Sequence, residues 1–158
     1  VGETFVLPEA KIAENTMLIP GTDGQKMSKS RNNIINIFLG DKALRKQIMS
    51  IESDSTPLED PKNAETCNIF ALYKLIATES QIDAMLENYK NVNRDYGYGH
   101  AKQALYELIV STFSIEREKY NYYMNNLAEL EAILQLGAAK ATTIATGVLG
   151  RVRLKLGF

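Results

Sequence analysis

Most of this chain carries apolar side chains at the spacing of an α-helix, and this pattern limits the fold more than any other feature. In the longest such segment, Ala101, Leu105, Leu108, Ile109 and Phe113 recur at i, i+4, i+7, i+8 and i+12. Residues at this spacing lie on one face of a helix, where they can pack against a neighbouring element. The sequence therefore predicts a mainly α protein whose helices pack as a bundle.

Glycine and polar positions predict where the helices begin and end. Asp41 is a candidate N-cap for the first helix. The breaks between later helices are expected at Gly97, Gly99 and Gly137. These later helices are predicted over residues 64–78, 80–92, 100–126, 127–136 and 138–156.

The first 39 residues lack this helical pattern. Residues 3–12 are short and apolar and are interrupted by Pro8, which predicts a strand end leading into a loop. A second apolar run, Met17–Ile19, stops at Pro20. From Gly21 to Asn33 the chain is polar and has no apolar period, so a loop is expected there.

Composition excludes several functional classes. The formal charge of −1 gives no global basic field, so any contact with nucleic acid requires a local patch. Cys67 and His100 are the only cysteine and histidine, which excludes disulfides and argues against metal centres and hydrolytic triads. We expect no metal site, and a buried structural thiol at Cys67.

The same features give expectations about location. No apolar run is expected to reach membrane length, which predicts a soluble protein without membrane contact. A single cysteine and the lack of a visible leader before Val1 indicate a reducing cytoplasm. Because the chain does not begin with methionine, a processed chain or an excised piece is expected.

The loop from Gly21 to Asn33 has the composition of an anion-binding element. Lys26 and Lys29 lie three residues apart, and Ser28 and Ser30 accompany them. Ammonium groups, hydroxyls and backbone N–H groups of this kind can contact a polyphosphate. No G-x-x-x-x-G-K-[ST] pattern occurs in the loop, so any nucleotide is bound by a different scheme from the P-loop.

The pentapeptide KMSKS, Lys26 to Ser30, matches the second signature motif of class I aminoacyl-tRNA synthetases. Its context, PGTDGQKMSKSRNN, resembles the loop of the bacterial tryptophanyl-tRNA synthetases. Four further stretches resemble that family at corresponding places: VLPEAKI, RKQIMSIESDS, YGYGHAK and GAAKATTIA. The resemblance covers essentially the whole chain.

This resemblance implies the carboxyl-terminal half of such an enzyme. Residues 1–39 would end a Rossmann-like catalytic domain and carry the KMSKS loop, and residues 40–158 would form the helical domain that binds the tRNA anticodon. The family joins L-tryptophan to ATP and passes the tryptophanyl group to tRNA(Trp), as a homodimer. No H-x-G-H motif occurs in this chain, so the chain alone is expected to be inactive.

The resemblance also implies roles for the loop residues. Lys29 would be the principal contact to the transition state and Lys26 the supporting one. Lys26, Met27, Ser28, Lys29 and Ser30 would together bind ATP, which enters with Mg²⁺. Met27 has an alternative role as an apolar hinge that packs beneath the loop. Arg31 stands where the family more often has tyrosine or aspartate, and we interpret it as a solvated side chain.

Three cations near the end of the chain are candidates for contact with tRNA. Lys140, Arg151 and Lys155 border an apolar stripe on one predicted helix, where they suit either phosphate contact or cover of the core edge. Tyr96 and Tyr98 are expected to pack at the edge of the core rather than stack on bases. Two alternatives stay open: a tyrosyl-tRNA synthetase fragment, and a non-catalytic helical RNA-binding or scaffold module.

Overall fold

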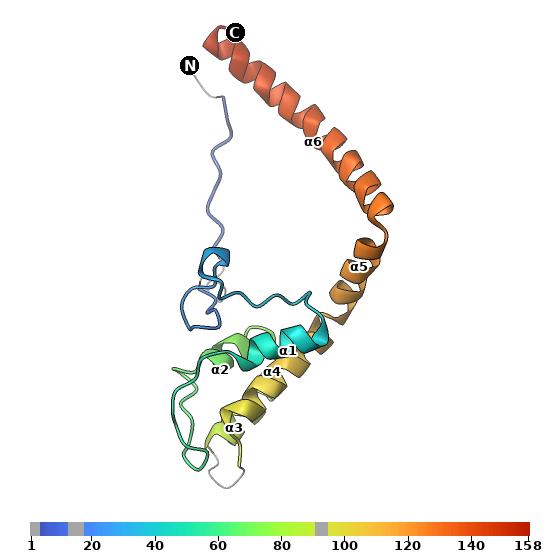
Figure 1. The fold of residues 1–158 in the computed structure, drawn as a ribbon. Helices are drawn as coiled ribbons and strands as arrows, with labels where there is room; N and C mark the ends of the chain where they lie inside the picture. Colours follow the sequence, from blue (N-terminus) through green and yellow to red (C-terminus); the bar gives the residue numbers. More distant parts are fainter. Residues whose placement is uncertain (1–3, 13–17, 91–94) are drawn as a thin grey trace. The chain divides into compact units, whose positions relative to one another are not determined.

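The computed structural model describes residues 4–12, 18–90 and 95–158, which are helical for most of their length (Figure 1). One 3-10 turn, η2, spans Lys29–Arg31. The helices are α1 (Asp41–Met49), α2 (Asn68–Tyr73), α3 (Glu79–Lys90), α4 (Tyr98–Thr112), α5 (Ser114–Asn125) and α6 (Leu127–Leu156). The prediction of a mainly α fold is confirmed.

The chain divides into two compact units, Ala13–Arg117 and a second made of Val1–Ile12 with Glu118–Phe158. The first unit contains α1 to α4 and the predicted loop. The second contains most of α5 and all of α6. The functional boundary expected after residue 39 stays a prediction.

The apolar face of α4 forms the centre of the first unit. Its residues Ala101, Leu105, Leu108 and Ile109 are all buried, as the spacing predicts. Helices α1 and α2 both pack against α4. They add buried side chains to the same core, among them Leu44, Ile48, Ile69, Phe70 and Leu72.

An aromatic cluster closes the core around Tyr89, which is 1% exposed. The ring of Tyr89 has its centroid 5.9 Å from that of Phe70, 6.1 Å from that of Tyr96 and 6.3 Å from that of Tyr98. Its hydroxyl lies 3.4 Å from the sulfur of Cys67. Burial raises the pKa of Tyr89 far above its usual value and that of Tyr96 to about 12. Cys67 is therefore a buried structural thiol, as expected. Tyr96 and Tyr98 pack at the edge of the core, which was also predicted.

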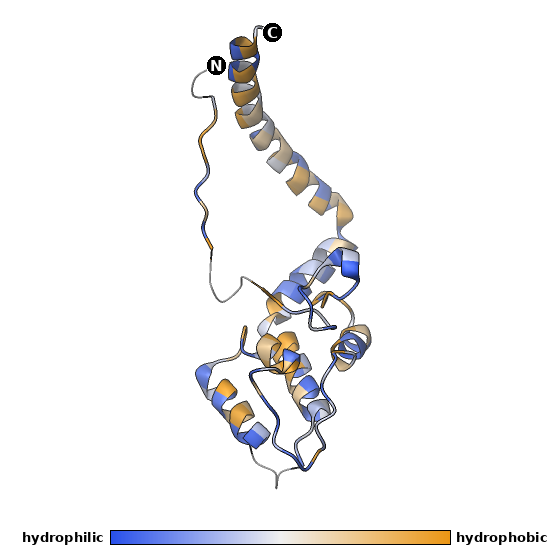
Figure 2. Ribbon diagram, turned by 90° about the vertical axis from the view of Figure 1, so that its left-hand side faces the viewer, coloured by the Kyte–Doolittle hydropathy of each residue, from blue (hydrophilic) through white to orange (hydrophobic). Residues whose placement is uncertain are grey.

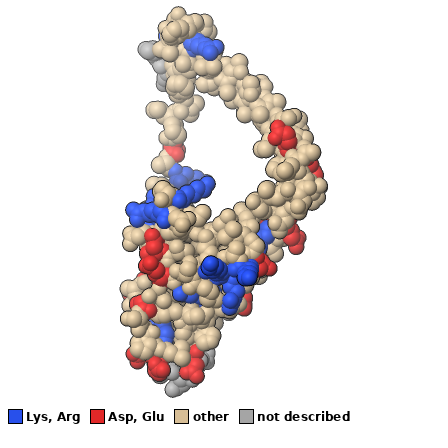
Figure 3. All heavy atoms as spheres, viewed as in Figure 1, with Lys and Arg blue, Asp and Glu red and all other residues tan. Residues whose placement is uncertain are grey.

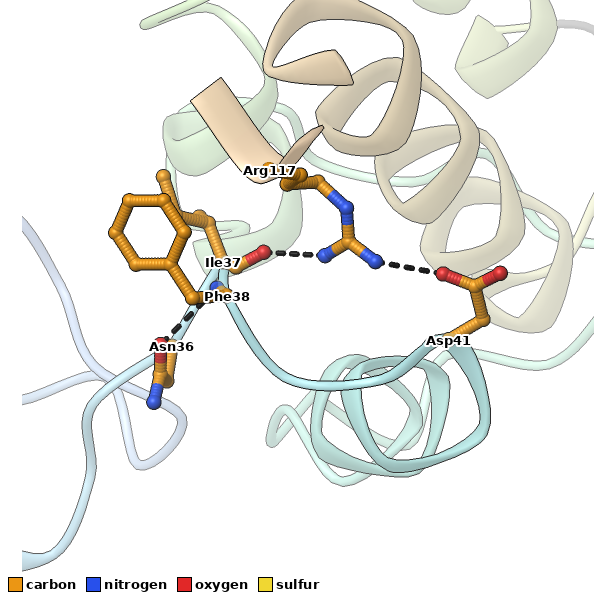
Figure 4. A network of polar contacts seen from close by, with 5 residues as sticks. All are labelled: Asn36, Ile37, Phe38, Asp41 and Arg117. Carbon is orange, nitrogen blue, oxygen red and sulfur yellow. Dashed lines mark hydrogen bonds and ion pairs between the residues drawn. The ribbon is translucent and has the colours of Figure 1, made fainter. Parts of the chain in front are cut away.

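The start of α1 is held by Arg117, the last residue of the first unit. One guanidinium nitrogen donates to the Ile37 carbonyl and another lies 2.6 Å from an Asp41 carboxylate oxygen (Figure 4). Phe38 N–H donates to Asn36 Oδ1 in the same turn. The N-cap of α1 is Gly40, so the prediction of Asp41 as the cap is wrong by one residue. Asp41 instead opens the helix, where a carboxylate suits the helix dipole and is available to Arg117.

Four predicted helix boundaries are also wrong. The segment expected at 64–78 is helical only over Asn68–Tyr73. The segment expected at 100–126 is interrupted at Phe113, which has φ −102° and ψ 21°. Gly99 lies inside α4 and Gly137 inside α6, instead of at the predicted breaks. Glycine inside a helix costs only about 1 kcal/mol relative to alanine, which neighbouring strong helix formers such as Leu136 and Ala138 offset.

The expected strand at the start of the chain is not present in its described part. Residues 4–12 form neither helix nor strand. The nearest β-type pairing in the described ranges is an isolated antiparallel bridge between Pro20 and Lys26. A strand needs a partner for its backbone groups, and no described segment supplies one here. The predicted run Met17–Ile19 falls partly outside the described residues.

Helix α6 differs from α4 because none of its residues is buried. Figure 2 shows hydrophobic residues along much of the helix that ends at the C-terminus. Lys140 is the only charged residue between Glu131 and Arg151, so by length and composition alone α6 could cross a membrane. The expectation that no apolar stretch reaches this length is therefore wrong. A single such helix is weak grounds for a membrane.

The core predicts a large difference between two isoleucines of the first unit. Ile109 is 5% exposed, whereas Ile115 is 61% exposed. Ile109→Ala is expected to lower the free energy of unfolding by about 2 to 5 kcal/mol, because it leaves a cavity in the core. Ile115→Ala is the matched control and should change it by less than about 1 kcal/mol. Urea denaturation measures both, and equal effects would contradict this core.

Candidate functional site

The loop predicted from Gly21 to Asn33 begins with a narrow backbone turn. Met27 N–H donates to the Ile19 carbonyl at 2.9 Å, and Gly21 N–H donates to the Gln25 carbonyl at 2.7 Å. Gly24 has φ +73°, in the left-handed region that favours glycine. The turn therefore brings Lys26 back beside Pro20.

The second half of the loop is a short helical turn. Ser28 is the N-cap of η2, whose first residues are Lys29 and Ser30. Asn32 ends the turn with φ 53° and ψ 28°, and its N–H donates to the Lys29 carbonyl. The hydroxyl oxygens of Ser28 and Ser30 lie 2.8 Å apart and form a hydrogen bond with each other.

The charged ends of the loop side chains face solvent. Lys26, Lys29 and Arg31 are exposed. Among the residues that the structure describes, neither lysine ammonium group has a hydrogen-bond or ion-pair partner. In Figure 3, Lys and Arg side chains stand out from the region where Figure 1 places this loop. Within the described part of the chain both ammonium groups are therefore accessible, and their contact with an anion stays a prediction.

Met27 is the apolar exception in the motif. It is partly buried and packs against the hydrophobic core. Its N–H is already used by the Ile19 carbonyl. These contacts support the alternative in which Met27 is an apolar hinge beneath the loop.

The inside of the loop is filled by Asn33, which is 2% exposed. Its Nδ2 donates to Asp23 Oδ1 at 2.6 Å and to the Lys26 carbonyl at 3.2 Å. Its Oδ1 accepts a hydrogen bond from Ser28 N–H at 2.7 Å. Asn33 is not predicted from the sequence, because Asn32 and Asn33 are adjacent and identical and only the fold distinguishes them.

The carboxylate of Asp23 takes part in the same arrangement. The hydrogen bond from Asn33 lowers the pKa of Asp23 from its usual value, with further help from Gln25 N–H and the charge of Arg31. Asp23 therefore stays ionised near neutral pH and serves as an acceptor for the loop.

One hydrogen bond and one close approach connect the loop to the helical core. Glu52 N–H, just after α1, donates to the Thr22 carbonyl at 2.7 Å. A Cβ built on Gly24 would lie 2.5 Å from Nδ2 of Asn68, the first residue of α2. The loop therefore depends on the segments that follow α1 and begin α2.

A hollow of about 280 Å³ lies beside these segments, lined by residues 52–54 and 66–68 together with Tyr98. Within it the Tyr98 hydroxyl donates to Asp54 Oδ1 at 2.8 Å. The pKa of Asp54 is lowered, first by hydrogen bonds from Thr56 and then by that from Tyr98. Asn68 Nδ2 also donates to the Glu52 carbonyl there, at 3.4 Å.

The three cations expected to contact tRNA lie elsewhere. Lys140, Arg151 and Lys155 are all exposed and all belong to α6, in the second unit. Placing them on one helix agrees with the predicted spacing. Their role toward RNA stays a prediction.

Comparison with known proteins gives a consistent set of relatives. The family model described as tRNA synthetases class I (W and Y) matches residues 1–114. The tryptophan–tRNA ligase of Campylobacter jejuni strain RM1221 is 46% identical over 99% of this chain. That of Rhodopirellula baltica is 41% identical over 99% of this chain. Each of these matches covers 48% of the relative, so the chain spans about half the length of the curated relatives it matches.

A solved structure agrees with these relatives. The crystal structure of tryptophanyl-tRNA synthetase from Campylobacter jejuni, complexed with ADP and tryptophan, matches with a TM-score of 0.84 and 45% identity. The match covers 99% of this chain and 49% of that one. The family resemblance inferred from the KMSKS context is therefore confirmed.

The loop geometry predicts that Gly24 tolerates no side chain. Gly24→Ala is expected to lower the free energy of unfolding by about 1 to 2 kcal/mol, because alanine is strained at positive φ and would crowd Asn68. The matched control is Gly99→Ala in α4, where a Cβ meets nothing within 4 Å. That control should be neutral or stabilising by up to about 1 kcal/mol. Chemical denaturation that found Gly24→Ala as stable as the parent chain would contradict the loop conformation.

Proposed function

The chain belongs to the class I tRNA synthetase family of the tryptophan and tyrosine enzymes, and from this premise we propose that it is the carboxyl-terminal half of a bacterial tryptophan–tRNA ligase. The observation that carries the proposal is the KMSKS loop, with two exposed ammonium groups on a hydrogen-bonded backbone. The relatives described above are tryptophan enzymes, which favours tryptophan over tyrosine. Their length supports a further catalytic half.

The proposed reaction has two steps. The carboxylate of L-tryptophan attacks the α-phosphorus of ATP, which forms tryptophanyl-adenylate and releases pyrophosphate. The terminal ribose hydroxyl of tRNA(Trp) then takes the tryptophanyl group and AMP leaves. The tryptophan pocket is proposed to lie in the other half of the enzyme, and Mg²⁺ to enter bound to the phosphates of ATP.

The loop is proposed to act in the first step. Negative charge grows on the leaving pyrophosphate as the bond to the α-phosphorus breaks. Lys29, at the start of η2, and Lys26, in the turn before it, would meet this charge with ammonium groups that no described residue occupies. Contacts that strengthen in the transition state lower the barrier. Ser28 and Ser30 would donate to the phosphates after releasing their mutual hydrogen bond.

The helical part is proposed to bind the tRNA. Lys140, Arg151 and Lys155 present three exposed cations along α6, which suits contact with a phosphate backbone. The complete enzyme is proposed to be a cytoplasmic homodimer, because the family resemblance implies that state and a protein that charges tRNA acts in translation.

The loop proposal predicts a specific decrease of activity in the full-length protein. Lys29→Ala is expected to slow ATP–pyrophosphate exchange by about 100- to 1000-fold, the usual effect of removing one preorganised charge contact. Lys74→Ala, which removes an exposed lysine just after α2, is the control and should leave the rate unchanged. An unchanged rate for Lys29→Ala would reject the role of the loop.

The tRNA proposal predicts a change in salt dependence. The triple substitution of Lys140, Arg151 and Lys155 to alanine should weaken binding of tRNA(Trp). It should also reduce the slope of log K against log salt by about one for each phosphate that the variant no longer neutralises. A control triple substitution uses the exposed lysines 42, 74 and 90. An equal slope for both variants and the parent protein would remove α6 from the tRNA surface.

A further inference from the structure

A buried polar side chain needs hydrogen-bond partners, and those bonds fix the position of the groups around it. The described residues contain two such side chains, Asn33 and Lys62. Lys62 Nζ donates to the carbonyls of Pro57, Leu58 and Asp60, each at 2.8 Å, so it holds the turn just before it in sequence. Asn33 differs because its partners belong to the loop that carries the two lysines.

We propose that Asn33 is a positioning residue for the adenylation step, which fixes the backbone on which Lys26 and Lys29 are mounted. The proposal rests on the proposed function of the loop. Asn33 is nearly inaccessible to solvent and so does not contact ATP itself. It acts through the residues to which it bonds.

Two of the three hydrogen bonds of the Asn33 side chain bracket Met27. Nδ2 donates to the carbonyl of Lys26, and Oδ1 accepts from the N–H of Ser28. Ser28 is the N-cap of the turn that begins with Lys29. One amide group therefore fixes the backbone directly after the first lysine and directly before the second.

The remaining capacity of the amide is also used. The second Nδ2 hydrogen points to Asp23 Oδ1, which accepts Gln25 N–H at 3.0 Å as well. The backbone carbonyl of Asn33 accepts Thr22 N–H at 2.9 Å. Asn33 thus links the first turn of the loop to the second. Among the described residues, no buried side-chain nitrogen or oxygen is left without a hydrogen-bond partner.

The fold reserves space for this amide at Gly21. A Cβ on Gly21 would lie 2.4 Å from both Cγ and Nδ2 of Asn33. Any larger residue at position 21 would push the amide out of its seat. This close approach explains why glycine is present here without a positive φ.

Asparagine is the residue whose chemistry fits this seat. The position needs two donors toward Asp23 and Lys26 and one acceptor toward Ser28, at the reach of a single methylene. Aspartate has the same shape but lacks both donors, and it would set a second carboxylate against that of Asp23. The substitution Asn33→Asp therefore changes the bonding without changing the volume.

A preordered loop lowers the barrier because the lysines then need no further ordering when charge develops on the pyrophosphate. In full-length Asn33→Asp, kcat for ATP–pyrophosphate exchange is expected to fall about 10- to 100-fold, the scale of a misplacement near 1 Å. The KM for L-tryptophan should stay within about twofold, because that pocket is not part of the loop. The matched control is Asn32→Gly, which keeps the left-handed conformation of an exposed neighbour and should behave as the parent enzyme.

A combined substitution separates a positioning role from general destabilisation. If Asn33 acts through the two lysines, adding Asn33→Asp to the double variant Lys26→Ala, Lys29→Ala should slow exchange by less than about threefold beyond that double variant alone. Independent, multiplicative effects would overturn the proposal. The proposal would also be overturned if the Asn33→Asp variant exchanged at the full rate while the Lys29→Ala variant was slow.

Two further variants keep the test informative. If Lys29→Ala itself is at full rate, the proposed function of the loop fails, which is a different result from failure of Asn33 alone. Should Asn33→Asp not fold, Asp23→Ala releases one of the three side-chain bonds from the exposed side of the loop. That variant is expected to lower kcat by about threefold or more with the KM for L-tryptophan unchanged, and an unchanged kcat would overturn the proposal.

Discussion

The buried face of α4 is the surface on which residues 13–117 assemble. Ala101 and Leu105 are fully buried there, and α1 and α2 pack against the same helix. Because the ends of α1 and α2 are held in this way, Glu52 N–H and the Asn68 side chain have fixed places. The loop attaches to these two points, so an element made of polar residues takes its position from an apolar core some distance along the chain.

The acidic residue of the loop also has a structural role. Asp23 is the nearest acid to the lysines in sequence, and an ion pair with it would occupy the ammonium group that we propose meets a phosphate. Its carboxylate instead accepts hydrogen bonds from Asn33 Nδ2 and Gln25 N–H. Asp23 therefore stabilises the loop backbone, and it does not occupy the ammonium groups of Lys26 and Lys29.

The sequence predicted which segments are helical better than it predicted the residues at which the helices begin and end. The spacing of Leu105 and Ile109 indicated a buried helical face because helix periodicity is local information. The break at Phe113 and the continuity through Gly137 depend on small differences between neighbouring residues, which packing decides. The exposure of α6 could not be predicted either, since its apolar pattern resembles that of a packed helix. The KMSKS residues were found by resemblance, whereas Asn33 was not, because its partners lie five to ten positions away.

The loop glycines show most clearly how the fold changes the meaning of a residue. From sequence, Gly21 and Gly24 indicate only that the segment is a loop. In the structure, Gly21 makes room for the Asn33 amide and Gly24 for the Asn68 side chain, so both allow closer packing. The backbone around them is held by Thr22, Met27 and Ser28 N–H bonds. If the loop closes on ATP, the long side chains of Lys26 and Lys29 are then the parts with the most freedom to move, and the ordered backbone limits where their ammonium groups arrive.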